Sequence, residues 1–169
     1  PQITIASPPF FDGNTVYWQA SDGTLNCLGV NQPGYNARTV PLRDGNGQTL
    51  LLKSAPFVAG GYVYFQDTNN ALWRADNTGR VAAHALGSTP TSGSPVVTGE
   101  HVYFVGLDGK LLRRKIDGTG DCEWIGAYSA QSTPSVPEPD HVCFRDEKNR
   151  IVLTLGRLPN AVAKRGRQG

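Results

Sequence analysis

Two short stretches of the sequence combine aromatic and polar side chains that could bind a ligand. An aromatic ring beside hydrogen-bonding groups suits a sugar or a nucleobase, which stacks on the ring while its polar edge bonds to the neighbours. Asp and Asn are also typical of hairpin turns, and tryptophans pack between sheets, so a structural role is the competing interpretation. The predicted ligand-binding residues are Asp67, Asn69, Trp73, Arg74, Trp124 and Tyr128.

Patterns typical of catalysis or metal binding are not found in the sequence. No nucleophile elbow, phosphate loop or metal-ligand motif occurs. Cys27, Cys122 and Cys143 lie far apart without C-x-x-C spacing, which indicates free cysteines within strands and favours a reducing, cytoplasm-like compartment. We therefore expect no catalytic residue, no metal and no cofactor, and we predict that the chain is not an enzyme. A hydrolase or lyase remains a third alternative for its function.

The charge of the chain is unevenly placed. The formal net charge is +2, and the last thirteen residues contain four basic residues and no acid, so the rest of the chain carries −2. A mildly acidic body excludes a broad nucleic-acid surface and leaves only the tail for such contacts. No apolar run reaches the roughly 18 residues that a membrane-spanning helix needs, and we expect no membrane partner.

The elements that must position the candidate residues are four copies of one pattern. Each copy has a run of β-forming residues, a turn, and an aliphatic residue nine positions after the leading valine. The third copy, VYFVGLDGKL, has Asp108-Gly109 at the turn centre, a pair that predicts a type I′ turn with both residues at positive φ. The four copies are Val16–Leu25, Val63–Leu72, Val102–Leu111 and Val142–Ile151.

Further strands can be placed around each copy. A proline before the leading valine starts a short strand, and one more strand follows the third, which makes four strands in about 40 residues, typical of one propeller blade. In the first copy we predict Leu50–Leu52 as the fourth strand, after a loop at Val30–Asp44. Ile3–Ile5 is expected to complete the last blade and close the ring, with Ala161–Ala163 as the alternative.

The predicted fold class is therefore all-β, a β-propeller of four four-stranded blades. A segment of a larger propeller and a β-sandwich or barrel are the alternatives. The predicted organisation is a four-repeat propeller over residues 1–156, with its blades centred on 16–25, 63–72, 102–111 and 142–151, and a basic tail over 157–169.

The third copy with its lead-in reads GSPVVTGEHVYFVGLDGKLLRRKIDGTG, from Gly93 to Gly120. It resembles the quinoprotein-type (PQQ-like) repeat, which runs S-P-x-V-x-x-G-x-V-Y and then D-G-x-L, and it is similar to the YWTD-type repeat, which ends in a comparable D-G-T-G. The resemblance implies a propeller blade without assigning a subfamily. No catalytic residue and no calcium-associated Asp of these families can be matched here. Weaker resemblance extends to Ser54–Gly79, Ser7–Gly29 and Thr133–Gly156.

These observations favour a non-catalytic binding propeller. The leading hypothesis is a carbohydrate-binding lectin with sites between or on top of the blades. The alternative is a protein–protein interaction module of a larger protein, with Trp73 and the Val30–Asp44 loop as its contact patch. The expected partner is thus a glycan or a protein ligand, and a homodimer is the remaining alternative for assembly.

Overall fold

A computed structural model of the chain describes residues 4–30, 37–130, 132–137 and 141–155. These residues form fourteen β-strands and no helix. A helix able to span a membrane is accordingly not found within this part of the chain.

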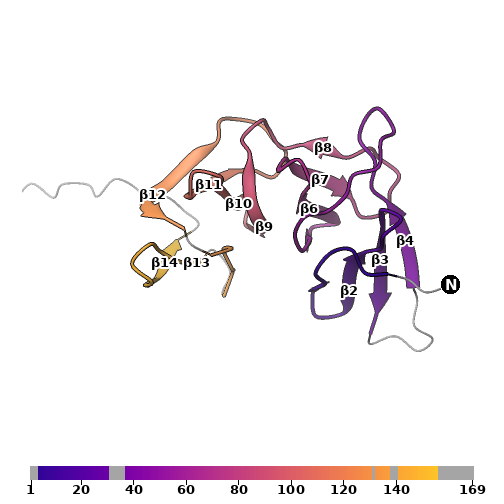
Figure 1. Cartoon of the computed structure of the whole chain (residues 1–169), viewed down its shortest axis with the longest axis horizontal. Coiled ribbons are helices and arrows are strands. Elements are labelled where there is room, and N and C mark those ends of the chain that lie inside the picture. Colours follow the sequence, from indigo (N-terminus) through magenta and orange to yellow (C-terminus); the bar gives the residue numbers. More distant parts are fainter. Residues whose placement is uncertain (1–3, 31–36, 131, 138–140, 156–169) are drawn as a thin grey trace, which may run out of the picture.

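The strands form four separate antiparallel sheets in chain order. Each sheet is a meander, because its strands pair in the order in which they occur in the sequence. The sheets follow one another along an arc, with sheet 1 and sheet 4 at its two ends (Figure 1). Sheet 1 contains β1 (Phe10–Phe11), β2 (Thr15–Gln19), β3 (Thr24–Gly29) and β4 (Ala37–Pro41); sheet 2 contains β5 (Phe57–Ala59), β6 (Tyr62–Gln66), β7 (Leu72–Asp76) and β8 (His84–Ala85); sheet 3 contains β9 (Thr91–Thr98), β10 (His101–Gly106), β11 (Lys110–Lys115) and β12 (Glu123–Ser129); sheet 4 contains β13 (His141–Arg145) and β14 (Ile151–Leu155).

The turn between the second and third strands has the same geometry in all four copies. The residue seven positions after the leading valine has a positive φ, which is 85° at Gly23, 66° at Asn70, 79° at Gly109 and 61° at Asn149. The residue before it does not, and the N–H of Gly109 donates to the carbonyl of Gly106 at 2.9 Å. The predicted type I′ turn is therefore wrong. The loop is a type I turn followed by one left-handed residue, a place for which Gly and Asn are suited.

The fourth strand of sheet 1 also differs from the prediction. β4 lies inside the stretch predicted as a loop and pairs with β3, so that Thr24 stands opposite Pro41. The predicted strand Leu50–Leu52 instead leads into sheet 2, where Leu52 forms a bridge with Asp67. The loop is rich in Gly, Pro and Asn, so its composition did not predict the short strand at Ala37–Pro41. Leu50 and Leu52 are buried between sheets 1 and 2, which explains why this segment is apolar although it is not the fourth strand of sheet 1.

The predicted closure of the ring by Ile3–Ile5 is wrong for the part that the structure describes. Ile5 forms a bridge with Ala20 of sheet 1 and not with β14. Its position relative to sheet 1 matches that of Leu52 relative to sheet 2, so Ile5 belongs to the first blade. In sheet 4, Ser135 forms a bridge with Cys143 on the side of β13 that a first strand would occupy. The alternative strand Ala161–Ala163 and the predicted tail 157–169 lie outside the described residues.

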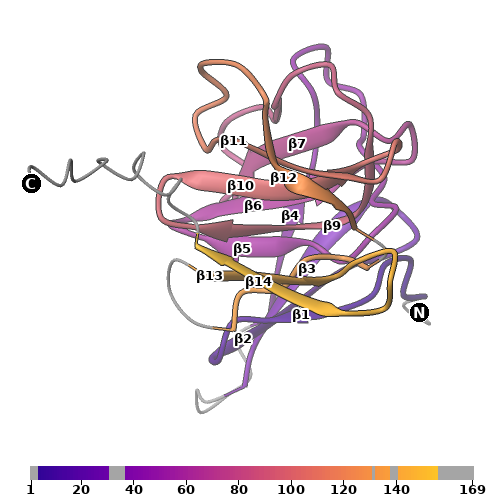
Figure 2. The ribbon, with the colours of Figure 1, turned by 90° about the vertical axis from the view of Figure 1, so that its left-hand side faces the viewer.

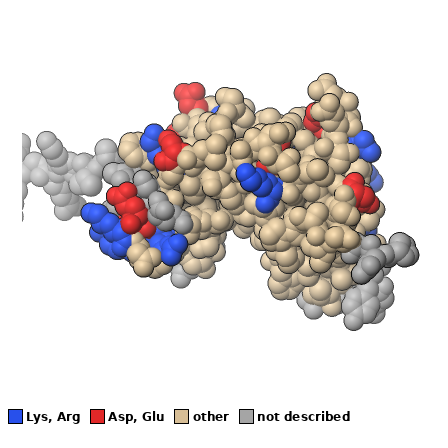
Figure 3. All heavy atoms as spheres, viewed as in Figure 1, with Lys and Arg blue, Asp and Glu red and all other residues tan. Residues whose placement is uncertain are grey.

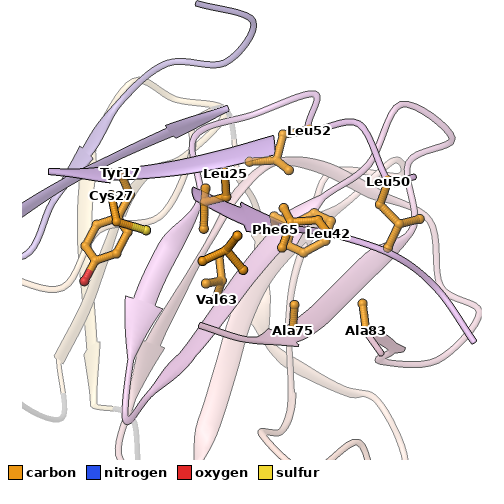
Figure 4. Packing of buried hydrophobic residues seen from close by; sticks show 11 residues of the cluster. Tyr17, Leu25, Cys27, Leu42, Leu50, Leu52, Val63, Phe65, Ala75 and Ala83 are labelled. Carbon is orange, nitrogen blue, oxygen red and sulfur yellow. The ribbon is translucent and has the colours of Figure 1, made fainter. Parts of the chain in front are cut away.

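The hydrophobic core consists of three clusters, one between each pair of consecutive sheets. Between sheets 1 and 2, Tyr17, Leu25 and Cys27 form one cluster with Val63 and Phe65 (Figure 4). The same arrangement recurs along the chain, so the tyrosine side of one hairpin faces the valine side of the next. Both sides of β6 and β10 are buried, which confirms that their continuous apolar runs serve two interfaces. Each fully buried side chain of this size contributes about 1.5–3 kcal/mol relative to exposure.

Two buried glutamines connect consecutive sheets through hydrogen bonds. The Gln19 side chain is fully buried; its amide donates to the carbonyl of Leu50 at 2.8 Å, and its oxygen accepts from the N–H of Leu52 at 2.7 Å. Gln66, at the equivalent position of sheet 2, accepts from the N–H of Gly93 at 3.0 Å. The segments that cross between blades thus have their backbone groups satisfied by the preceding sheet.

Candidate ligand pocket beside the β10–β11 hairpin

A pocket of about 480 Å³ lies beside the β10–β11 hairpin of sheet 3. The hairpin turn supplies Leu107 and Asp108, β11 supplies Lys110, and β12 supplies Trp124. Residues 89–90, from the segment that links sheet 2 to sheet 3, complete this part of the lining. The Leu107 N–H donates to the carbonyl of Pro90 at 3.3 Å, and this hydrogen bond connects the turn to the linking segment.

The outer strand of sheet 3 places Trp124 at the surface. Leu112 of β11 pairs with Trp124, whereas Lys110, only two residues away, pairs with Ser129. β12 therefore carries extra residues between these two pairs, and irregularities of this kind often re-aim side chains beside binding sites. The Trp124 side chain is 53% exposed. Tyr128 lies in the irregular part of β12, and its side chain is outside the described structure.

The polar side of the pocket is a Lys–Asp pair next to the indole. The Lys110 ammonium lies 2.7 Å from the Asp108 carboxylate and 5.7 Å from the ring centre of Trp124, within reach of a cation–π contact. The hydrogen bond from Lys110 lowers the pKa of Asp108, so the carboxylate stays ionised at neutral and mildly acidic pH. A ligand in this pocket would thus meet an aromatic surface and one charge of each sign.

A second hollow of about 510 Å³ lies on the other side of the same turn. Leu107 and Gly106 line both hollows, and the second is otherwise lined by small and hydroxyl-bearing residues such as Ser92, Ser132 and Thr133. Leu107 is 59% exposed. The hairpin turn therefore brings an exposed apolar side chain to the lining of both hollows.

Trp73, Asp67 and Asn69 come together in the structure, but they form a hairpin turn and not an open site. Asp67 is 3% exposed; one of its oxygens accepts from the N–H groups of Asn69 and Ala71 at 2.9 and 2.8 Å, and the other accepts from the indole N–H of Trp73 at 2.9 Å. Trp73 is half-buried and packs against the cluster between sheets 1 and 2. The polar atoms of Asp67 and the Trp73 indole are thus already used within the fold.

Arg74 connects sheet 2 to sheet 3. Its guanidinium donates to the carbonyl of Ile116 at 2.6 Å and lies 4.4 Å from the ring centre of Tyr62. It lines a shallow depression of about 400 Å³ at the opposite ends of these strands, together with Tyr62 and His84. Because these contacts hold the side chain in place, Arg74 is a structural link at the edge of that depression.

Of the residues that the sequence predicted to bind a ligand, Trp124 lines this pocket, and the other lining residues were not predicted. Leu107 occupies a turn position that is polar in the other three copies, where Ser21, Thr68 and Glu147 stand. An apolar side chain in an exposed turn needs a reason, and this difference between the copies was a signal that could have identified the pocket. Cys122, which also lines it, had no comparable signal.

All three cysteines are free thiols. Cys27 and Cys143 lie in strands, as predicted, whereas Cys122 precedes β12. Burial raises the pKa of Cys122, so its thiol stays protonated at neutral pH. Within the described ranges, no group of three or more His, Cys, Asp or Glu side chains is placed to hold a metal ion.

No family model matches the sequence, and neither does any curated protein. Solved structures do resemble the fold. The computationally designed Ika4 protein has 16% identity and a TM-score of 0.55, with 92% of each chain covered. BamB from Moraxella catarrhalis has 10% identity and a TM-score of 0.55 over 88% of this chain and 44% of its own. A chain of a nidogen/laminin complex has 15% identity and a TM-score of 0.60 over 92% of this chain and 62% of its own.

These likenesses establish the fold class. The neighbours are β-propellers, designed ones included, and the four blade-like sheets agree with them. The predicted all-β propeller is therefore confirmed, whereas the quinoprotein-type and YWTD-type subfamilies are not distinguished. This chain spans less than two thirds of the BamB chain and of the chain from the nidogen/laminin complex.

Proposed function

We propose that this chain is a non-catalytic binding module whose pocket beside the β10–β11 hairpin accepts an apolar side chain of a protein partner. The observation that carries the proposal is the exposure of Trp124 and Leu107, 53% and 59%, at the rim of one pocket. Large apolar side chains that rim a concave surface are typical of the residues that dominate protein–protein affinity. One similar fold is found in a nidogen/laminin complex, which agrees with a role in protein recognition.

The charged groups of the pocket favour binding over catalysis. Asp108 is ionised and held by Lys110, so it lacks the raised pKa that a general acid needs. The Cys122 thiol, with its raised pKa, is a poor nucleophile because the thiolate is the reactive form. Both groups are better suited to orient a ligand than to transform it.

A glycan is the second candidate ligand. The exposed indole of Trp124 and the ionised Asp108 would supply a stacking surface and an acceptor for hydroxyl groups. Lys110 lies near one face of the indole and takes up part of the stacking surface that a sugar ring requires. This contact favours the protein ligand.

A peptide library and a glycan array distinguish the two ligands. Peptides selected from a phage-displayed random library on the immobilised chain should contain an aromatic or aliphatic anchor and bind in calorimetric titration. We expect Trp124→Ala and Leu107→Ala each to weaken this binding by about tenfold or more. Val81→Ala is the matched control, since Val81 is 57% exposed but lies outside this pocket.

The outcome of the same experiment can refute the proposal. Selected peptides that bind Trp124→Ala as tightly as the original chain would remove the pocket from consideration. Binding on the glycan array that is lost in Trp124→Ala, without any selected peptide, would replace the protein ligand with a carbohydrate.

A further inference from the structure

The two ends of the arc carry largely apolar sheet faces that no other sheet covers within residues 4–30, 37–130, 132–137 and 141–155. The front face belongs to sheet 1, on the side turned away from sheet 2. The rear face belongs to sheet 4, on the side turned away from sheet 3; sheet 4 is the near layer in Figure 2. The pairing registers put Ile5, Phe11, Val16, Trp18 and Leu28 on the front face. They put Cys143, Ile151 and Leu153 on the rear face, together with the polar residues His141 and Arg145.

On the rear face, Ile151 is exposed although its counterparts are buried in every other copy. Ile151 follows the turn as Leu25, Leu72 and Leu111 do, and these leucines are 0%, 1% and 0% exposed. Ile151 itself is 74% exposed, and Leu153 on the same face is 58% exposed.

The front face shows the same contrast. Phe11 pairs with Val16 as Val58 pairs with Val63 in sheet 2. Val63 is completely buried and Val58 packs against the cluster between sheets 1 and 2, whereas Phe11 is 54% exposed and Val16 only half-buried. Ile5, the counterpart of Leu52, is 62% exposed, while Leu52 is 5% exposed.

The two faces are the two halves of an interface that the chain already forms three times. In each internal interface, the side that carries Tyr17, Tyr64 or Tyr103 packs against the valine side of the following sheet. The rear face is the side equivalent to these tyrosines, and the front face is the valine side. They do not meet within one chain, because sheets 1 and 4 lie at opposite ends of the arc, with an indentation between them (Figure 3).

We propose that a second copy of this chain covers both faces. The rear face of each copy packs on the front face of the other, so that two equivalent interfaces form about a two-fold axis and close a ring of eight blades. A second copy fits because it brings both complementary faces at once, and a closed pair leaves no apolar face exposed. This assembly does not depend on the pocket beside the β10–β11 hairpin.

The assembly is tested by the mass of the chain in solution. Analytical ultracentrifugation across a concentration series should give twice the chain mass of 18.2 kDa. Ile151→Lys and Phe11→Lys should each give the mass of a single chain, because each places an ammonium group in both interfaces. Both side chains are largely exposed in the single chain, so its fold should be kept, which circular dichroism verifies. Val81→Lys is the matched control, since Val81 is equally exposed and on neither face, and it should remain a dimer.

The reactivity of Cys143 provides a second measurement. Cys143 lies on the rear face, so alkylation by iodoacetamide should be slow in the dimer and faster in Phe11→Lys, whose change lies on the other face. A single-chain mass at every concentration would overturn the proposal. Dimers that persist in both lysine variants, or Cys143 protected at the mass of one chain, would overturn it as well. Loss of peptide binding in Trp124→Ala with an unchanged mass keeps this assembly separate from the proposed function.

Discussion

Asp67→Ala should destabilise the chain strongly, because both oxygens of this carboxylate accept hydrogen bonds within the hairpin. The substitution removes the acceptor for three hydrogen bonds, from the N–H groups of Asn69 and Ala71 and from the Trp73 indole. Hydrogen bonds to charged groups contribute about 1.5–3 kcal/mol each, and their sum is reduced because the turn relaxes and water reaches part of it. We expect the free energy of unfolding to fall by about 3 kcal/mol.

Asp67→Asn separates the two functions of the side chain. Its remaining oxygen can still accept from the two backbone N–H groups, whereas its amide N–H₂ would face the Trp73 indole N–H, donor against donor. The expected loss is about 1 kcal/mol, and it should vanish when Trp73 is already Phe.

Urea unfolding followed by tryptophan fluorescence measures both variants, and an unchanged dependence on urea concentration would show that the unfolded state is the same. A loss below about 1 kcal/mol for Asp67→Ala, or equal losses for the Ala and Asn variants, would refute the reasoning. Either result would return Asp67 to the set of side chains available to a ligand.

Three further predictions concern stability and reactivity. Gln19→Leu should lower the free energy of unfolding by about 2 kcal/mol in urea unfolding, because three buried backbone groups lose their side-chain partner, namely the carbonyls of Gly23 and Leu50 and the N–H of Leu52. Trp124→Ala should change the free energy of unfolding by less than about 0.5 kcal/mol. The hydrogen bond from Arg150 lowers the pKa of Asp146. The ionised Asp146 therefore stabilises the fold fully above the ordinary pKa of an aspartate, and this stabilisation is lost as the pH falls through the lowered pKa. Acid unfolding of Asp146→Asn should show a weaker pH dependence in this range. A ligand in the pocket should slow alkylation of Cys122, read by mass spectrometry, while Cys27, 1% exposed, should react slowly with or without it.

The repeat pattern was sufficient to predict the blades, because each blade is a local structure. A strand, a turn and a returning strand are encoded within about ten residues, and the alternation of side chains follows from the geometry of a strand. The turn type was mistaken because Asp108-Gly109 suits two kinds of loop. The backbone conformation of Asp108, whose φ is not positive, and the hydrogen bond from the Gly109 N–H to the Gly106 carbonyl distinguish them.

The candidate site was predicted in part, and the reason is again physical. Trp73 and Trp124 look alike in the sequence, since each follows a turn and stands beside a charged residue. Their difference arises from neighbours far along the chain: Trp73 packs against the cluster between sheets 1 and 2, whereas Trp124 stands on an outer strand with no sheet over it.

The sequence alone thus determined the class of fold, the number of repeats and the residues that face other blades, since these depend on local periodicity. The tertiary structure decided which strand completes sheet 1, which turn bears the pocket and which two faces remain uncovered. These features depend on how neighbouring blades pack and where the arc ends. Leu25 and Ile151 occupy the same place in their repeats, yet Leu25 is buried and Ile151 is exposed, because in the described part of the chain only Leu25 has a following sheet against it.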